Sequence, residues 1–217
     1  PILANVYLHY VLDLWFEKCI KKQLYGEAYL VRFADDFLIM FQYERDAQRV
    51  YEAIIKRMEL FGLELSKEKT RILPFGRSCA SRETFDFLGF THFNSKTRKG
   101  YYTVGHKISR KKKKQFKSNL KEWVKENRNT QFDEFMKTLN KKLTGSINYY
   151  SLSGMIREIK CLWQHSLFVT FKWMNRRSQR RSFKLDKFCE IWNDRIIHPY
   201  IHVDIWSGDK VIYIKNV

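Results

Sequence analysis

Apolar side chains recur at helical spacing over residues 1–22, from Leu3 near the start to Trp15 further along. The proline at the first position suits a helix start, because an N–H group would have no partner there. Residues 44–61 repeat the pattern on one face, and Gly62 then supplies a helix stop. We therefore predict two amphipathic helices in this part of the chain.

Two short apolar runs, "YLVRF" at 29–33 and "FLIMF" at 37–41, lie between the expected helices and flank the residues "ADD". Aromatic and β-branched side chains dominate both runs, which is typical of β-strands. We expect a further strand pair around 63–75 and another strand over 84–93, before the hairpin turn "NSKTRKG". The pattern up to this point predicts an α+β unit.

The second half of the chain has helical periodicity. We expect one helix around Trp123, a second over 130–145 and a third over about 155–178. The hydroxyl of Thr130 is placed to cap the second helix, with Asp133 three residues further on. This half is therefore expected to be all-helical.

The change of pattern places a domain boundary near residue 105. We predict an α+β fold with a mixed domain at 1–105 and a helical domain at 106–217. Charge divides at nearly the same place, because residues 1–95 hold 13 Lys and Arg against 13 Asp and Glu, whereas 96–217 hold 28 against 10. The whole formal net charge of +18 therefore belongs to the helical half.

Such a charge imbalance repels itself unless a polyanion is the partner. Aromatic residues alternate with cations in "QFKSNLKEWVKENR" and "LFVTFKWMNRRSQRRSF", which suits phosphate contacts combined with base stacking. A membrane surface explains the charge less well, because core-type Trp and Phe occupy the same segments. No apolar run approaches the ~18 residues of a membrane span either. Nucleic acid is the expected partner, and a membrane is not.

The four cysteines are widely separated, without a CxxC pair, and nothing at the N-terminus resembles a signal peptide. This usage is typical of free thiols in a reducing compartment rather than of a disulfide framework or a zinc site. We expect an intracellular protein of the bacterial cytoplasm.

Asp35 and Asp36 stand side by side between the two expected strands. Carboxylates at a hairpin tip can hold Mg²⁺, which prefers hard oxygen ligands and keeps substrate phosphates in its shell. Two such ions can stabilise the attacking and leaving oxygens of a phosphoryl transfer. Neighbours on a strand face opposite sides, so the pair shares one site only where the turn bends. Asp35 is therefore the stronger candidate for a direct ligand, and Asp36 is either a second ligand or a residue that supports the ligand. The alternative is an ordinary Asp-rich turn, but the basic helical half favours the metal site.

The stretch "RFADD" resembles the active-site motif of reverse transcriptases, in which group II intron proteins usually have Tyr at the position of Phe33. The stretches "PILANVYLHYVLDLWF", "GLELSKEKTRI" and "FDFLGFTHF" resemble the palm segments around that motif, in the same order. Downstream, "LNKKLTGSINYYSLSG" and "WMNRRSQRRSF" resemble the thumb, or maturase domain, of group II intron-encoded proteins. The resemblance covers roughly 1–202 and implies a partial palm followed by a basic helical thumb.

The resemblance also implies a role for each matching residue. Asp35 and Asp36 would coordinate catalytic Mg²⁺, and Phe33 would line the floor beneath the primer terminus. Lys69 would lie near the incoming triphosphate, with a solvated lysine as an equal alternative. Phe87, Leu88 and Gly89 would grip the primer strand, with ordinary strand packing as an equal alternative. The remaining residues would bind nucleic acid: Lys111, Lys112, Lys113, Lys114, Arg176, Arg177, Arg180 and Arg181.

In the family a first palm aspartate and the fingers precede these segments, so we expect this chain to be the later part of a palm plus a thumb, inactive alone. The leading hypothesis is an RNA-directed DNA polymerase that uses deoxynucleotides on an RNA/DNA primer-template and binds intron RNA to assist splicing and mobility. A non-catalytic RNA-binding splicing cofactor and a decayed remnant are the alternatives, and a homodimer is left open. Trp163 and Trp173 are expected in the core rather than as stacking platforms.

Overall fold

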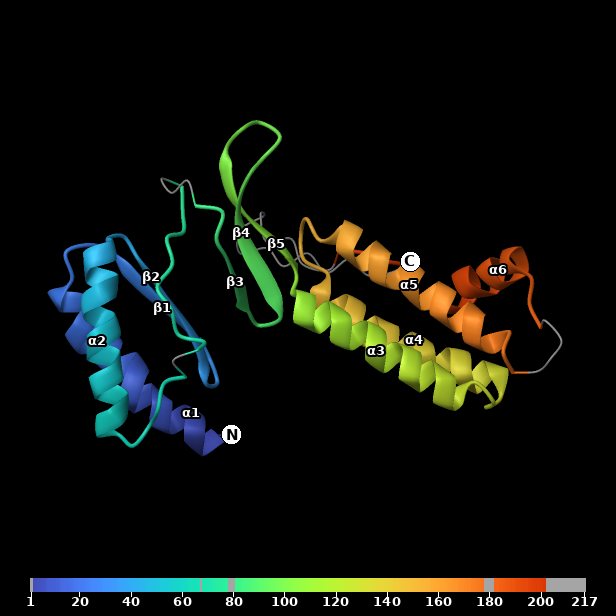
Figure 1. The fold of residues 1–217 in the computed structure, drawn as a ribbon, viewed down its shortest axis with the longest axis horizontal. Coiled ribbons are helices and arrows are strands. Elements are labelled where there is room, and N and C mark those ends of the chain that lie inside the picture. The colour runs from blue at the N-terminus through green and yellow to red at the C-terminus, as the bar shows by residue number, and fades with distance from the viewer. Residues whose placement is uncertain (1, 67, 78–80, 178–181, 202–217) are drawn as a thin grey trace. The chain divides into compact units, whose positions relative to one another are not determined.

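A computed structural model describes residues 2–66, 68–77, 81–177 and 182–201 of the chain. The chain divides into two compact units, each with its own apolar core. The first unit extends to Leu88 and includes Phe93–Val104, whereas the second consists of Gly89–His92 and the chain from Gly105 onward. The order of the elements can be followed in Figure 1. The fold class is α+β, as the sequence predicts.

The first unit opens with a helical segment whose geometry changes along its length. It begins as α1 (Ile2–Leu8) and continues through two π-helical turns, η1 (His9–Asp13) and η2 (Phe16–Ile20), to a 3₁₀ turn, η3 (Lys21–Gln23). Turns of the π type are rare and occur frequently at functional sites. The helix predicted over 1–22 is therefore present but irregular.

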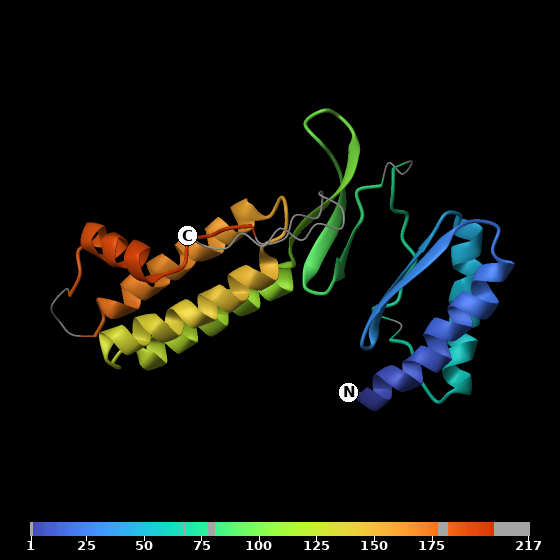
Figure 2. The ribbon, with the colours of Figure 1, turned by 180° about the vertical axis from the view of Figure 1, so that it is seen from behind.

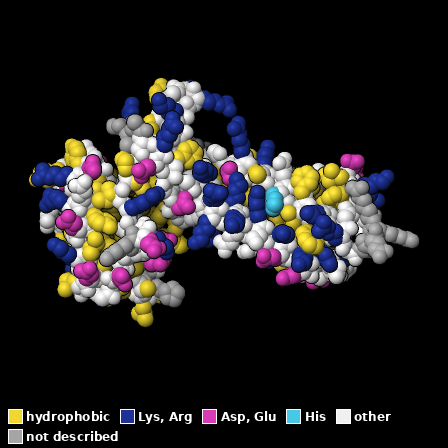
Figure 3. All heavy atoms as spheres, viewed as in Figure 1, with side chains coloured by type: hydrophobic (Ala, Val, Ile, Leu, Met, Phe, Trp, Pro, Cys, Tyr) yellow, Lys and Arg dark blue, Asp and Glu magenta, His cyan; other side chains and the backbone are white. Residues whose placement is uncertain are grey.

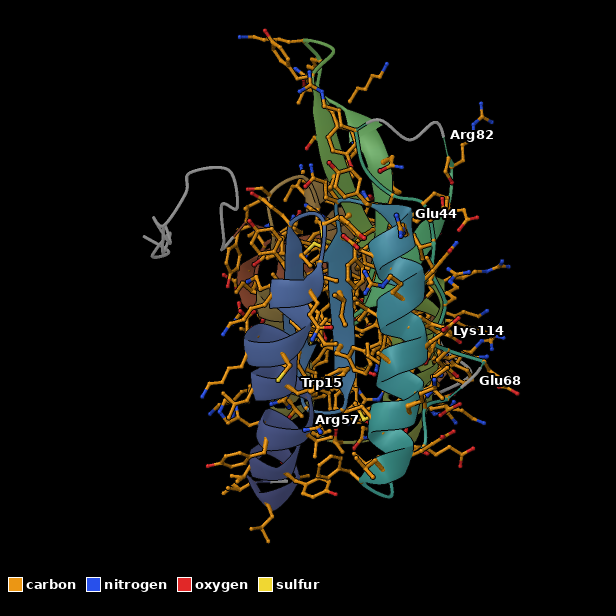
Figure 4. All side chains as sticks on the ribbon, turned by 90° about the vertical axis from the view of Figure 1, so that its left-hand side faces the viewer. Trp15, Glu44, Arg57, Glu68, Arg82 and Lys114 are labelled. Atoms are coloured by element: carbon orange, nitrogen blue, oxygen red, sulfur yellow. The ribbon has the colours of Figure 1, made fainter. Side chains whose placement is uncertain are left out.

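The hairpin of β1 (Ala28–Phe33) and β2 (Asp36–Phe41) follows, and its antiparallel pairing confirms the two strands expected from sequence. The next element is α2 (Glu44–Leu60), the second predicted helix, with Glu44 and Asp46 in its first turn. Negative charge at that end is favourable, because the N-terminus of a helix carries a partial positive charge. Figure 4 shows the first helical segment and α2 side by side in front of the hairpin.

Alternate residues of β1 and β2 pack against both helical segments and form the core of the first unit. Ala28 and Leu30 of β1 face this core, whereas Tyr29 and Val31 face away from it. The period of two places every second side chain of a strand on one face. The buried members of the core are Val11, Leu12, Phe16, Ala28, Val50, Ile54 and Met58.

Arg57 ties α2 to the first helical segment. Its Nε donates to the carbonyl oxygen of Val11 at 3.1 Å, and its guanidinium lies 5.5 Å from the ring centre of Trp15 and 4.3 Å from that of Phe61. Figure 4 marks Trp15 and Arg57 on these two segments. Contacts between guanidinium and aromatic faces are attractive, so Arg57 helps to fix the two helical segments that support the hairpin.

A second sheet contains β3 (Thr84–Phe87), β4 (Phe90–Lys96) and β5 (Tyr102–Ile108) in that order. The single strand expected over 84–93 is wrong, because a turn at Leu88 and Gly89 divides it into β3 and β4. Both residues have a positive φ, of 50° and 82°, which no strand allows. The hairpin turn expected after β4 is confirmed.

The strand pair expected around 63–75 is wrong, because the described residues in that range form no strand. Leu63 and Leu65 pack against the core of the first unit instead. A turn follows, in which the carbonyl oxygen of Ser66 accepts from the backbone N–H of Thr70 at 2.9 Å. The turn interrupts the run before a ladder can form.

The second unit is built from α3 (Arg110–Asn127), α4 (Phe132–Tyr150), α5 (Ile156–Met174) and α6 (Leu185–Arg195). α5 contacts α3, α4 and α6, and Figure 2 shows α3 and α4 running alongside each other. Aromatic residues such as Phe135, Phe188 and Trp192 fill the core between the helices. None of the described helices combines the length and the apolar character needed to cross a membrane.

The helical predictions hold for α3, α4 and α5 but fail at their ends. The Thr130 hydroxyl donates to the carbonyl oxygen of Asn127 at 2.8 Å and does not cap α4, which starts at Phe132. α4 continues past Gly145, whose position has open space around it, and α5 ends at Met174. α6 was not expected from the sequence at all.

Candidate functional site

The tip of the β1–β2 hairpin carries the two candidate metal ligands. The register pairs Phe33 with Asp36, so a turn of only Ala34 and Asp35 joins the strands. Ala34 has a φ of 54°, a left-handed conformation that is uncommon for residues other than glycine. Strain of this kind persists only where the surroundings enforce it, and it concentrates at functional sites.

Both aspartates are exposed to solvent. Asp36 shares a face of the hairpin with Phe33, its cross-strand partner, and this face lies opposite the core. Phe33 is 64% exposed. The ion pairs formed among the described residues include neither carboxylate. Both carboxylates are therefore available to an external ligand.

Arg32 holds this turn from the core side of β1. Its Nε and Nη2 donate to the two carboxylate oxygens of Asp13, each at 2.7 Å. Its Nη1 donates to the carbonyl oxygen of Ala34 at 2.8 Å and to the side-chain oxygen of Asn5 at 3.0 Å. Bidentate Arg–carboxylate contacts fix geometry as well as charge, so the first helical segment braces the turn that presents Asp35.

The electrostatics of this brace favour the charged forms of both partners. Hydrogen bonds from Arg32 lower the pKa of the Asp13 carboxyl below its ordinary value. The same hydrogen bonds raise the pKa of the Arg32 guanidinium. Opposite charges at hydrogen-bonding distance stabilise one another, so the pair stays ionised at neutral pH.

The donor set at the hairpin tip fits magnesium. Two adjacent carboxylates offer hard oxygen ligands, and their exposure leaves space for the water and phosphate ligands that Mg²⁺ retains. Within the described ranges, no three or more His, Cys, Asp or Glu side chains come together as a metal cage. Asp35 and Asp36 would therefore hold the ion together with a further carboxylate or with substrate phosphates.

Lys69 lies in the turn after Ser66, and its side chain is exposed. Its backbone N–H donates to the carbonyl oxygen of Ser66 at 3.1 Å. No hydrogen bond or ion pair of the described residues joins its ammonium to the aspartate pair. Its role at a triphosphate stays a prediction.

Leu88 and Gly89, two of the three predicted primer contacts, form the turn after Phe87. Positive φ at both positions is what a two-residue hairpin turn requires. The carbonyl oxygen of Gly89 accepts from the backbone N–H of Ser109 at 2.9 Å. A Cβ at Gly89 would meet Cγ of Lys112 at 3.5 Å, an ordinary contact, so glycine is needed there for its backbone conformation.

Three aromatic rings lie beside this turn. Phe90 stacks on Tyr149 with ring centres 5.7 Å apart and meets Tyr150 edge-on at 5.5 Å. Tyr149 stays 54% exposed, whereas burial, with a smaller contribution from Tyr149, raises the pKa of Tyr150. The structure thus brings Gly89 and Lys112 together beside an aromatic group that sequence reasoning missed. The doublet "YY" at 149–150 was the available signal.

The predicted lysine run lies in the first turns of α3, which Ser109 caps by accepting from the backbone N–H of Lys112. Lys113 donates to Glu158 at 2.8 Å, with both side chains about 30% exposed, and so holds α3 against α5. Lys111, Lys112 and Lys114 are exposed. These three keep their charge available to an external anion.

The predicted arginines follow the end of α5. Arg176 is exposed, whereas Arg177 is half-buried and donates to the carbonyl oxygen of Thr130 at 2.8 Å. Arg180 and Arg181 lie outside the described residues. Figure 3 shows Lys and Arg side chains gathered over the helical unit, whereas both signs of charge are mixed over the first unit.

Sequence reasoning also missed the brace formed by Arg32 and Asp13. The signal was present, because Arg32 follows Ala28 and Leu30 on the core-facing side of β1. A charged side chain on that face requires a partner of opposite charge. The sequence alone does not tell which of the carboxylates of the chain supplies it.

Comparison with known families agrees with this geometry. Residues 1–92 match the family model described as reverse transcriptase (RNA-dependent DNA polymerase). Residues 113–189 match the maturase-specific domain of group II introns. Comparison with curated proteins gives no match for this chain. The first match defines the class as reverse transcriptase. The two matches together show that the chain belongs to the family of group II intron reverse transcriptases and maturases.

Proposed function

We propose that this chain carries the catalytic hairpin and the RNA-binding helical unit of an RNA-directed DNA polymerase encoded by a group II intron. Such an enzyme extends the 3′ hydroxyl of a primer with deoxynucleotides on an RNA template. The observation that carries the proposal is the exposed pair Asp35 and Asp36 on a strained turn that Arg32 and Asp13 brace.

Each group at the hairpin tip has a distinct part in this proposal. Asp35 and Asp36 hold Mg²⁺, which when bound neutralises charge on the reacting phosphate and on the attacking and leaving oxygens. Phe33 offers an apolar surface on the face that it shares with Asp36, where the primer terminus rests. Arg32 acts through the backbone of Ala34 and positions the carboxylates without contacting the substrate.

The turn at Gly89 would contact the primer strand. The left-handed conformation of Leu88 and Gly89 makes the turn tight, and the primer contact would come from its half-buried backbone. Lys112 and the exposed ring of Tyr149 lie beside it and could add a phosphate contact and a stacking surface. This assignment extends the primer role predicted for Phe87, Leu88 and Gly89.

Primer extension on an RNA template, with Mg²⁺ and deoxynucleotides, tests the catalytic proposal. The described residues gather no third carboxylate at the pair, so this chain is assayed fused to the fingers and first palm half of a related enzyme. Asp35→Asn removes a ligand charge without changing size, and we expect extension to slow at least about a hundredfold. Glu52→Gln, at an exposed carboxylate of α2, is the matched control. Equal rates for the two variants would refute the proposal.

The maturase-domain match favours a second function, which is to stabilise folded intron RNA during splicing. This function needs the positive charge of the helical unit and not the aspartate pair. We expect splicing assistance to survive Asp35→Asn and to fall when Lys111 and Lys114 are both replaced by Gln. The opposite pattern, with loss in Asp35→Asn alone, would contradict a separate RNA-binding function.

A further inference from the structure

Three cationic side chains of the helical unit meet on the ring of Trp173. The Nζ of Lys125 lies 5.9 Å from the ring centre, and the guanidinium carbons of Arg128 and Arg176 lie at 5.4 and 5.3 Å. The cations come from the end of α3 and from the segment that follows α5. Segments far apart in sequence thus place three positive charges on one aromatic side chain.

Trp173 is a fixed support for these cations. Its ring is half-buried and packs against the apolar core of the helical unit. The sequence predicted that Trp173 is a core residue, and this is confirmed for the part of the ring that packs against the core. The rest of the ring contacts the three cations. A nearby brace, from Arg177 to the carbonyl oxygen of Thr130, ties the end of α5 to the start of α4.

Helix polarity explains only part of this arrangement. Cations are favourable at the C-terminal end of a helix, where Lys125 and Arg128 lie on α3 and Arg176 lies just beyond α5. That effect favours cations at each helix end but does not require cations from two different helices to converge on one ring. Three like charges around one ring repel one another unless an anion lies among them.

No acidic group among the described residues forms an ion pair that supplies that anion. Among the ion pairs of the described residues, none involves Lys125, Arg128 or Arg176. Asp133, in the first turn of α4, is paired with Arg195. The cations on Trp173 therefore keep their charge for an external partner.

We propose that Lys125, Arg128 and Arg176, held together on Trp173, form a binding site for a backbone phosphate of RNA. The assignment rests on the RNA-binding function proposed above and adds a defined anchor point to it. In this site Trp173 positions the three cations, and its ring contacts guanidinium and ammonium groups rather than a base. Arginine suits such a site, because its planar guanidinium can donate to two phosphate oxygens at once.

The test measures binding of a short RNA duplex to the full chain by fluorescence anisotropy, over a series of salt concentrations. The variant K125Q/R128Q/R176Q is compared with K137Q/K160Q/K187Q, a control that removes three exposed lysines of α4, α5 and α6. Each lost phosphate contact should reduce the slope of log affinity against log salt by about one. Because the proposed site binds one phosphate, we expect the Trp173-site variant to lose about one from this slope and about tenfold or more in affinity. The control should lose less than half as much.

Trp173→Leu and Trp173→Phe separate this site from a merely charged surface, because neither changes the net charge. Leucine should weaken RNA binding severalfold by releasing the cations, and phenylalanine should restore most of it. Circular dichroism checks that each variant remains folded. If Trp173→Leu does not fold, the triple variant and its control provide the test. Equal losses in the triple variant and its control would overturn this site while leaving RNA binding intact. A wild-type chain that does not bind the duplex would instead overturn the proposed RNA-binding function.

Discussion

Replacing Asp13 by alanine tests whether the brace behind the hairpin tip is energetically important. The substitution removes both acceptors of Arg32 at 2.7 Å and leaves its guanidinium, 13% exposed in the wild type, held only by Ala34 and Asn5. Asp13 itself is 25% exposed. The pair therefore lies between a buried and a surface ion pair.

The magnitude follows from that intermediate burial. Breaking a buried ion pair costs about 3–5 kcal/mol, whereas an exposed pair contributes under about 1 kcal/mol. We expect Asp13→Ala to lower the free energy of unfolding by about 2–3 kcal/mol. Asp13→Asn keeps the shape and one acceptor, and should cost about half of that.

Urea unfolding measures the loss, and amide hydrogen exchange locates it. Exchange should accelerate in the peptide 28–41, because the turn at Ala34 loses its support. Glu17→Ala is the matched control, since Glu17 forms an exposed pair with Lys21 on the same helical segment. If Asp13→Ala costs no more than Glu17→Ala and leaves exchange in the hairpin unchanged, the brace has no structural importance and the reasoning fails.

Three further predictions concern the pH dependence of stability, the buried carboxylate of Asp46 and the turn at Gly89. Because the pKa of Asp13 is lowered in the folded state, the stability advantage of the wild type over Asp13→Asn should be complete above about pH 5. That advantage should be lost as the pH falls below 3.8 and through the folded-state pKa, which urea unfolding at several pH values measures. Asp46 is buried and accepts from the backbone N–H groups of Tyr25 and Gly26 at 3.0 Å, so Asp46→Ala should cost about 2–4 kcal/mol by the same assay, and Asp46→Asn less. Gly89→Ala should cost about 1–2 kcal/mol in thermal unfolding, because alanine is strained at a φ of 82°, and a neutral result would contradict the assigned turn.

The fold was predictable from sequence where one local pattern decided the structure. α2 and the β1–β2 hairpin followed from helical spacing and from short aromatic and β-branched runs. The prediction of a strand pair over 63–75 was wrong because Leu63 and Leu65 pack against the core of the first unit instead of pairing as strands. The division of β3 from β4 failed because Leu88, an ordinary strand residue by type, adopts a left-handed conformation before Gly89.

Only those parts of the site that depend on residue type and on neighbours in the sequence could be predicted. Asp35 and Asp36 could be found because they are adjacent and flanked by strands. The partner of Arg32 could not, because Asp13 is brought to it by tertiary packing across 19 positions of sequence. The convergence of Lys125 and Arg176 on Trp173 depends in the same way on how α3 packs against α5.

A change of metal preference tests most directly whether Asp35 holds the catalytic ion. In the fused enzyme, Asp35→Cys replaces a hard carboxylate by a soft thiolate, which binds Mg²⁺ poorly and softer ions such as Cd²⁺ well. We predict that primer extension by this variant is lost with Mg²⁺ and returns when Cd²⁺ is added, while Glu52→Cys extends normally with Mg²⁺. Full activity of Asp35→Cys with Mg²⁺, or a loss that Cd²⁺ does not repair, would contradict direct coordination by Asp35.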